Sequence, residues 1–358
     1  MNKRTSVFAM VSLLSLVVLS GACAPAATTA PTSEPAAATS APAAQRLKVS
    51  LMVGGIDKII YLIPTLAKQL GYFDEQNLDV DVLDEPSGVS AEDAMLAGQV
   101  NFTVGFYDHN IDLQSKGKAT MSVIVLDQVT GEAEMVATKL ADQIKSPADF
   151  KGRNLGVTSI GSSTWFLTNY LAVKAGLKPE DIHPVAVSAG NTLIAAIQKG
   201  QVDAAMTTEP TISRLLKSGD AKVMLDMRTT DGNKTALGGG YPGACLYGQV
   251  DWINKNKEVT QRLVNALYKA LRFTKTHTAD EIAAKVPADF YAGDKDLYLT
   301  ALKSSLDMFS PDGTMPADAP QTVLNVQNAF NKSVQGKQIN LGATYSDDFA
   351  KNSAKAIK

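Results

Sequence analysis

The run Gly161-Ser162-Ser163-Thr164 has the residue types best suited to binding chemistry. Helical spacing begins at Ser163, so the run would open a helix, where backbone N–H groups lack partners and the helix dipole places partial positive charge. Together with the hydroxyl groups, such a turn suits a sulfonate, a carboxylate, nitrate or a phosphate. The alternative is that one serine caps the helix and no ligand approaches it.

Further candidates lie in the turns after the predicted strands, because ligands of open α/β sheets bind beyond the carboxyl ends of strands. Aromatic side chains among them could stack on a planar ring. Asp108 could bind a cationic or hydrogen-bonding group, or it could cap the helix that follows it. No arginine falls on these turns, which disfavours a doubly charged anion. The candidate ligand-binding residues are Gly55, Tyr61, Ser87, Tyr107, Asp108, Ser162, Ser163, Thr164, Trp165, Asn191, Glu209 and Tyr241.

Signals for a metal, a cofactor or catalysis are weak. No two histidines have metal-ligand spacing, and Cys245 has no cysteine partner once Cys23 is set aside. The run Gly238–Gly243 fits the letters of a dinucleotide-binding turn, but Pro242 would interrupt the helix that the turn should open. No Gly-x-Ser-x-Gly motif occurs. We therefore expect no cofactor, no metal and no catalytic residue.

Two series of alternating strands and helices would position the candidate turns. The strands of the first series are predicted over residues 47–53, 78–83, 102–105 and 121–126. The strands of the second series are predicted over residues 154–158, 184–188, 203–207 and 222–225. Ala94–Asn101 and Ala196–Asp203 share the pattern Ala-x-x-x-Gly-Gln-Val-Asn/Asp, in which a helix ends at glycine before a strand. Two α/β lobes of equivalent architecture are therefore expected.

The domain boundaries follow from these two series. Lobe 1 is predicted over 46–135 and lobe 2 over 136–240, with 241–358 returning to lobe 1 as a strand and C-terminal helices. The chain would cross between the lobes near 132–140 and again near 228–248, where a loop over 229–242 is expected. A paired crossing makes a hinge, so the fold class is α/β with two lobes on a two-strand hinge.

The N-terminal residues 1–22 have the pattern of an export signal peptide. Lys3 and Arg4 precede an apolar run that is shorter than the about 20 residues of a membrane-spanning helix. Leu19-Ser20-Gly21-Ala22-Cys23 resembles a bacterial lipobox, although its large aliphatic residue lies one place too early. Cys23 is therefore expected to carry the lipid, and the alternative is ordinary secretion.

Residues 23–45 are expected to form a disordered tether, because after Cys23 they are almost wholly Ala, Pro, Thr and Ser, with one charge at Glu34. The formal net charge of the chain is -2, which indicates neither nucleic-acid binding nor a polybasic membrane surface. The N-terminal lipid would be the contact with the membrane.

An ordered set of short motifs runs along the chain. They are Ala67–Phe73 leading into Leu78–Val82, Ala97–Phe102, Asp149–Gly152, Leu155–Thr158, Gly161–Thr164, and Gly200–Ala205 through Glu209-Pro210. In this order, behind an export signal, the set resembles the periplasmic solute-binding proteins of nitrate, sulfonate and taurine importers, which include carriers of thiamine-precursor pyrimidines. The resemblance covers nearly all of the chain from Leu47 onward.

The resemblance implies a type II periplasmic-binding-protein fold and a monomer outside the cytoplasm. Such a protein would hold a small solute, either an organic anion or a planar heteroaromatic molecule, between its lobes. It would deliver the solute to an ABC permease and its ATPase. The alternatives are a carrier specific for a vitamin or its precursor, such as a pyrimidine or a flavin, a ligand-sensing receptor, and a pyrimidine-forming enzyme of the same fold.

Overall fold

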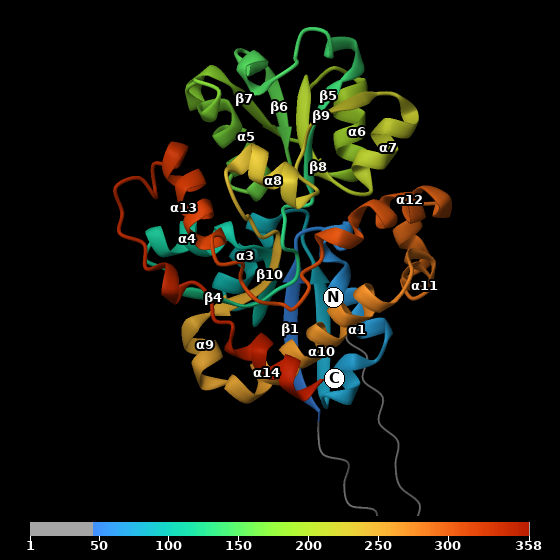
Figure 1. Cartoon of the computed structure of the whole chain (residues 1–358), viewed down its shortest axis with the longest axis vertical. Helices are drawn as coiled ribbons and strands as arrows, with labels where there is room; N and C mark the ends of the chain where they lie inside the picture. The colour runs from blue at the N-terminus through green and yellow to red at the C-terminus, as the bar shows by residue number, and fades with distance from the viewer. Residues whose placement is uncertain (1–45, 358) are drawn as a thin grey trace, which may run out of the picture. The chain divides into compact units, whose positions relative to one another are not determined.

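Two five-stranded sheets frame the computed structural model, which describes residues 46–357. The expectations for the export signal, Cys23 and the tether concern residues outside this range. The strand orders are β2-β1-β3-β10-β4 in the first sheet and β7-β6-β8-β5-β9 in the second (Figure 1). The strands are β1 (Leu47–Val53), β2 (Leu78–Asp84), β3 (Phe102–Phe106), β4 (Thr120–Val125), β5 (Glu132–Ala137), β6 (Asn154–Val157), β7 (His183–Ala186), β8 (Ala204–Thr208), β9 (Ala221–Asp226) and β10 (Ala244–Gln249).

The two sheets repeat one topology. In each, the first strand pairs in parallel with the next two along the chain, and an antiparallel strand, β10 or β5, follows in the sheet. Both antiparallel strands contain a register shift, between Leu246 and Tyr247 in β10 and between Glu134 and Met135 in β5. This repetition confirms the predicted pair of equivalent α/β lobes.

The repeated sequence pattern has a conformational cause at its glycine. Gly98 and Gly200 lie just beyond helices α3 (Gly88–Leu96) and α6 (Gly190–Gln198), with φ values of 75° and 68°. This left-handed region is favourable for glycine and strained for other residues, so the helix can end there and turn into the next strand.

Helices cover the sheets and link the lobes. Their bounds are α1 (Leu62–Gln69), α2 (Tyr72–Glu75), α3 (Gly88–Leu96), α4 (Asp108–Ser115), α5 (Ser163–Lys174), α6 (Gly190–Gln198), α7 (Thr211–Ser218), α8 (Thr230–Leu237), α9 (Val250–Lys255), α10 (Lys257–Thr276), α11 (Ala279–Ala283), α12 (Lys295–Ser305), α13 (Ala319–Phe330) and α14 (Asp348–Ala356). Within residues 46–357, no helix combines the length and the apolar composition needed to cross a membrane.

The crossings between the lobes differ in detail from the prediction. The first lies between Val125 and Glu132, so all of β5 belongs to the second sheet and the boundary predicted at 135/136 falls inside this strand. The second crossing is not the predicted loop, because it contains α8. The Thr229 side chain accepts a hydrogen bond from the backbone N–H of Gly232, and Gly238 ends the helix with a φ of 91°. These are ordinary helix-capping features.

The C-terminal helices contact both lobes and not only the first. Helix α10 packs against α1, α2 and α14 beside the first sheet, and its apolar stripe at Leu263, Leu267 and Leu271 is buried. In contrast, α12 packs against α7, and α13 packs against both α4 and α5. Helices α5 and α7 belong to the second lobe, so the prediction that the C-terminal helices cover lobe 1 is incomplete.

Candidate ligand-binding site

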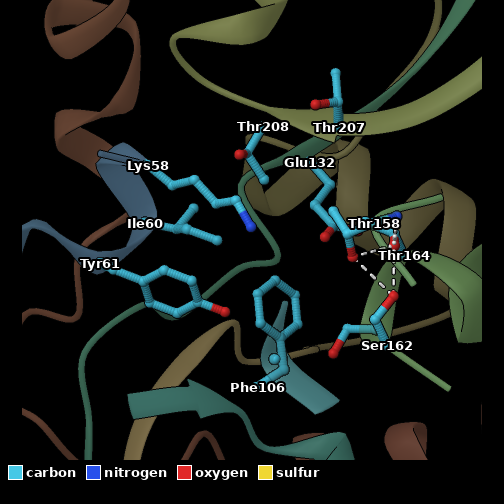
Figure 2. A pocket seen from close by; sticks show the side chains of 12 residues that line it. Lys58, Ile60, Tyr61, Phe106, Glu132, Thr158, Ser162, Thr164, Thr207 and Thr208 are labelled. Carbon is cyan, nitrogen blue, oxygen red and sulfur yellow. Dashed lines mark hydrogen bonds between the residues drawn. The ribbon is translucent and has the colours of Figure 1, made fainter. Parts of the chain in front are cut away.

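A cavity lies between the two lobes and is lined from both (Figure 2). The space within it that water-sized molecules can occupy is ≈ 20 Å³, which is room for about one water. The side chains of the two lobes therefore meet closely around it. The first lobe contributes Lys58, Ile60, Tyr61, Gly88 and Phe106, and the second contributes Glu132, Thr158, Ser162, Ser163, Thr164, Thr207 and Thr208.

The strand ends explain why these residues meet. Phe106 and Thr208 are the last residues of β3 and β8, and Thr158 directly follows β6. Carboxyl ends of parallel strands share one edge of a sheet, which is the edge where ligands of such sheets bind. Glu132 reaches the same edge from the opposite direction, because β5 is antiparallel and Glu132 pairs with Thr208.

The Ser-Ser-Thr turn forms its own hydroxyl network at the start of α5. Thr158 Oγ1 donates to Ser162 Oγ over 2.8 Å, and Ser162 Oγ lies 2.8 Å from Thr164 Oγ1. Ser162 occupies the N-cap position, but its side chain makes no capping hydrogen bond. Within the described residues, the N–H groups of Ser163, Thr164 and Trp165 have no acceptor. The turn therefore keeps free donors beside the cavity.

Lys58 brings a positive charge into the lining. It immediately precedes the short helix η1 (Ile59–Tyr61) and is only 7% exposed. Its ammonium group donates to the backbone carbonyl of Gly54 and is directed into the cavity in Figure 2. Burial lowers the pKa of Lys58, and the neighbouring carboxylates of Asp57 and Glu132 oppose that shift.

Glu132 brings a carboxyl group into the lining from the second lobe. It is 2% exposed, and its Oε2 has no hydrogen-bond partner within residues 46–357. Burial raises the pKa of Glu132 well above its ordinary value, Asp108 adds to the shift, and Lys58 opposes it. The hydroxyl oxygens of Thr207 and Thr208 also lack partners in this part of the chain.

A buried polar network joins the lobes behind the cavity wall. Ser163 Oγ donates to Asp108 Oδ1 over 2.9 Å, and the Tyr241 hydroxyl donates to Asp108 Oδ2 over 2.8 Å. His109 Nδ1 lies 2.6 Å from Glu92 Oε2. Burial alone would lower the pKa of His109, but the charges of Glu92 and Asp108 raise it to about 9. Burial raises the pKa of Asp108, partly offset by His109.

A second contact between the lobes is made by backbone alone, from the Ile59 N–H to the Glu209 carbonyl over 3.1 Å.

The structure brings some of the predicted site residues to the cavity and places others elsewhere. Tyr61, Ser162, Ser163 and Thr164 line it. Asp108 and Tyr241 lie directly behind Ser163. The N-cap position of α4 is Tyr107, which makes no side-chain cap, so Asp108 does not have the alternative capping role.

The remaining predicted residues have contacts away from the lining. Ser87 caps α3 by accepting a hydrogen bond from Ser90 N, and the Gly55 N–H donates to Asp84 over 3.0 Å. The Tyr107 hydroxyl bonds to Thr344.

Glu209 and Asn191 form polar contacts within the second lobe, and Trp165 packs against an aromatic ring. The Glu209 carboxylate accepts from Arg228 over 2.7 Å, and Asn191 bonds to Arg214. The Trp165 ring packs against Phe330, with the ring centres 5.7 Å apart.

Comparison with known proteins gives the family. Residues 61–280 match the family model described as "NMT1/THI5 like". A solved structure of a protein from Bordetella bronchiseptica RB50 is 32% identical, has a TM-score of 0.83, and is matched over 87% of this chain and 98% of that one. The alkanesulfonate-binding protein SsuA of Xanthomonas axonopodis pv. citri, bound to MOPS, has a TM-score of 0.65 at 19% identity over 85% of this chain and 100% of that one. The latter likeness shows the fold alone.

Two relatives have names that point to different activities. A protein of Escherichia coli K12 that is named as an aliphatic sulfonates-binding protein is 27% identical over 244 residues, which are 68% of this chain and 71% of that protein. The 4-amino-5-hydroxymethyl-2-methylpyrimidine phosphate synthase THI13 of Saccharomyces cerevisiae is 27% identical over 165 residues. That match covers 43% of this chain and spans 46% of the length of the yeast protein. The family match establishes that the chain belongs to the NMT1/THI5-like family, and the likeness to the Xanthomonas structure shows that it has the periplasmic-binding-protein fold.

Proposed function

We propose that the chain is an extracytoplasmic solute-binding protein of an ABC importer, which holds a small organic anion or a planar heteroaromatic molecule between its lobes. The observation that carries this proposal is the cavity between two lobes of matching topology, lined by polar side chains from both. Its accessible space of ≈ 20 Å³ is too small for such a solute, so the lobes would separate to admit one. The names of the Escherichia coli and Xanthomonas proteins support a sulfonate or a similar anion.

The chemistry of the lining suits a singly charged anion. Lys58 supplies one ammonium group, and the start of α5 supplies free N–H groups next to serine and threonine hydroxyls. Charge-assisted hydrogen bonds of this kind are about twice as strong as neutral ones. Tyr61 and Phe106 add aromatic walls, which would also accept a flat ring such as a vitamin precursor.

Thermal unfolding with a panel of sulfonates, carboxylates, pyrimidines and flavins tests the proposal. A solute that binds only the folded protein stabilises it by about 2.7 kcal/mol at a concentration of 100 times Kd. At least one compound should therefore raise the melting temperature in a dose-dependent manner. The proposal fails if none does so after refolding and if native mass spectrometry finds no small molecule bound to the purified protein.

Lipid attachment at Cys23 and delivery to a permease and its ATPase are part of the same proposal. They rest on the residues around Cys23 and on the family. Expression with a radiolabelled fatty acid should label the wild-type chain, and Cys23→Ser should abolish the label and release the protein from the membrane fraction. Equal membrane retention of the variant would reject the lipid anchor and leave solute binding untouched.

An enzyme is the second candidate, because the yeast relative is named as a pyrimidine phosphate synthase. Mass spectrometry of a bound solute over several hours separates the two functions. A binding protein returns the solute unchanged, whereas an enzyme converts it.

A further inference from the structure

A buried carboxyl group without a fixed partner faces the cavity. Glu132 is the first residue of β5 and is 2% exposed, and Figure 2 shows its carboxyl group directed into the cavity. Within residues 46–357, its Oε2 has no hydrogen-bond partner. The Lys58 ammonium group on the other side of the cavity bonds to the Gly54 carbonyl. The protonation state of Glu132 therefore decides whether this wall offers a solute an acceptor or a donor.

The surroundings of Glu132 favour its neutral form. Burial raises the pKa of Glu132 well above the ordinary value of 4.5, Asp108 and Glu134 add to the shift, and Lys58 opposes it. Burial has this effect because a charged group loses its hydration when it leaves water. The titratable groups that interact electrostatically with Glu132 are Lys58, Tyr61, Asp108, Glu134 and Tyr241.

The charges in the cavity balance only if Glu132 is neutral while an anion is bound. Among the described residues that line the cavity, Lys58 alone carries a positive charge. Arg228 follows β9 outside the lining, where it is paired with Asp226 and Glu209. An anionic solute and an ionised Glu132 would place two negative charges beside one ammonium group. A closed cavity strongly disfavours an unpaired charge, and a carboxyl group in this position takes up a proton instead.

A neutral Glu132 also suits the hydrogen bonds of its wall. A protonated carboxyl group has one O–H donor, whereas a carboxylate can only accept. The hydroxyls of Thr207 and Thr208 line the same cavity, and their oxygens have no partner within the described residues. All three side chains can then donate to one anion.

We infer that Glu132 is a neutral carboxylic acid in the closed, anion-bound protein and donates its proton in a hydrogen bond to the solute. The proton comes from the solvent when the lobes close, because a hydrated glutamate in the open cavity is ionised at neutral pH. Capture of an anion is therefore coupled to uptake of about one proton. This inference rests on the proposed solute-binding function and assigns the role of one residue in it.

Titration calorimetry at about pH 5 and about pH 8 tests the inference. The probes are ethanesulfonate, nitrate and propanoate, together with any other anion that the thermal unfolding panel identifies. Near the ordinary pKa of 4.5 part of the open form already carries the proton, whereas at higher pH closure must take it from the solvent. The affinity of the wild type should therefore fall at least about 10-fold over this range. Buffers with different ionisation enthalpies should reveal the uptake of the proton.

Glu132→Gln is the decisive variant, because glutamine has a similar shape and N–H donors but does not titrate. It should bind the anion with similar affinity at both pH values and more tightly than the wild type at about pH 8. A residue with a merely structural role would not produce this gain. Burial also lowers the pKa of Lys58, so loss of its charge could weaken anion binding at high pH. A pH dependence that survives Glu132→Gln would belong to Lys58 and would overturn the inference.

Glu134→Gln is the matched control, because Glu134 is a buried carboxyl group on the same strand that does not line the cavity. It should retain the pH dependence of the wild type, and circular dichroism confirms that each variant is folded. Wild-type binding that does not change with pH, or loss of binding in folded Glu132→Gln at both pH values, would overturn the inference and leave the proposed function standing. Binding of uncharged solutes alone would do the same. If no compound binds and no solute co-purifies, the proposed function fails together with the inference.

Discussion

Ser163 of the second lobe donates a 2.9 Å hydrogen bond to Asp108 of the first. Ser163 is the first residue of α5 and lines the cavity, and Asp108 is the first residue of α4. The other oxygen of this carboxylate accepts from Tyr241, which lies in the second crossing between the lobes. One buried carboxyl group therefore connects the cavity wall, the opposite lobe and the crossing.

A double-mutant cycle should detect this link. Ser163→Ala removes the donor of this buried hydrogen bond, and Asp108→Asn replaces its charged acceptor with a neutral amide, so the cycle should give a coupling energy of about 1 kcal/mol or more in the free energy of unfolding. Urea titration of the four proteins provides the measurement.

The control cycle for this link pairs Ser162→Ala with Asp108→Asn. Ser162 bonds to Ser159, Thr158 and Thr164 within its own lobe, so its coupling with Asp108 should be close to zero. Equal coupling in both cycles would show that the contact between Ser163 and Asp108 has no special role.

The sequence allowed the duplicated topology to be predicted because strand periodicity and helix-ending glycines are local signals. Ser162, Ser163 and Thr164 could be placed at the cavity by the strand-end rule. Glu132 was missed because that rule considers carboxyl ends, whereas an antiparallel strand brings its amino end to the same edge. A glutamate at the start of the buried strand Glu132–Ala137 was the available signal.

Lys58 was missed for a different reason. The path of the turn after β1 depends on how the first lobe packs, and sequence periodicity does not report it. A lysine directly before Ile59 and Ile60 was the only hint. Glu209 was predicted as a ligand-binding residue, but its carboxylate bonds to Arg228. The preceding residue, Thr208, lines the cavity instead.

Glu134 should make the stability of the protein depend on pH. It is fully buried, neither side-chain oxygen has a partner within residues 46–357, and burial raises its pKa from 4.5 to about 8. Because the folded-state pKa is the higher one, the contribution to stability is complete below pH 4.5 and is lost as the pH rises to about 8.

Glu134→Gln should remove this dependence, because glutamine does not titrate. Urea unfolding at pH 4.5 and pH 8 gives the difference in the free energy of unfolding between variant and wild type at each pH. This difference should shift in favour of the variant by at least about 1 kcal/mol at the higher pH. The constant cost of the buried amide cancels in the comparison, so an unchanged difference would contradict the assignment.

His109 should remain protonated at neutral pH because of Glu92. Burial alone disfavours the charged ring, but the Glu92 carboxylate at 2.6 Å and Asp108 raise the pKa to about 9. The stability that the protonated His109 ring contributes is complete below pH 6.5 and is lost as the pH rises to about 9. NMR titration of the imidazole signals should show this late transition, and Glu92→Gln should move it to lower pH. A transition unaffected by that substitution would show that Glu92 does not control the charge.

The contacts of the C-terminal helices with the second lobe should differ greatly in strength. Phe330 of α13 is 5% exposed and packs against Trp165 and Phe166, so Phe330→Ala should destabilise the protein by about 3 kcal/mol through loss of buried contacts. Lys217 of α7 pairs with Asp294 just before α12, but its side chain is 61% exposed. Solvent and salt screen such a pair, so Lys217→Ala should leave stability almost unchanged. Urea unfolding of both variants at two salt concentrations measures the contrast. A large effect at Lys217, or none at Phe330, would mean that charge and not aromatic packing holds these helices to the second lobe.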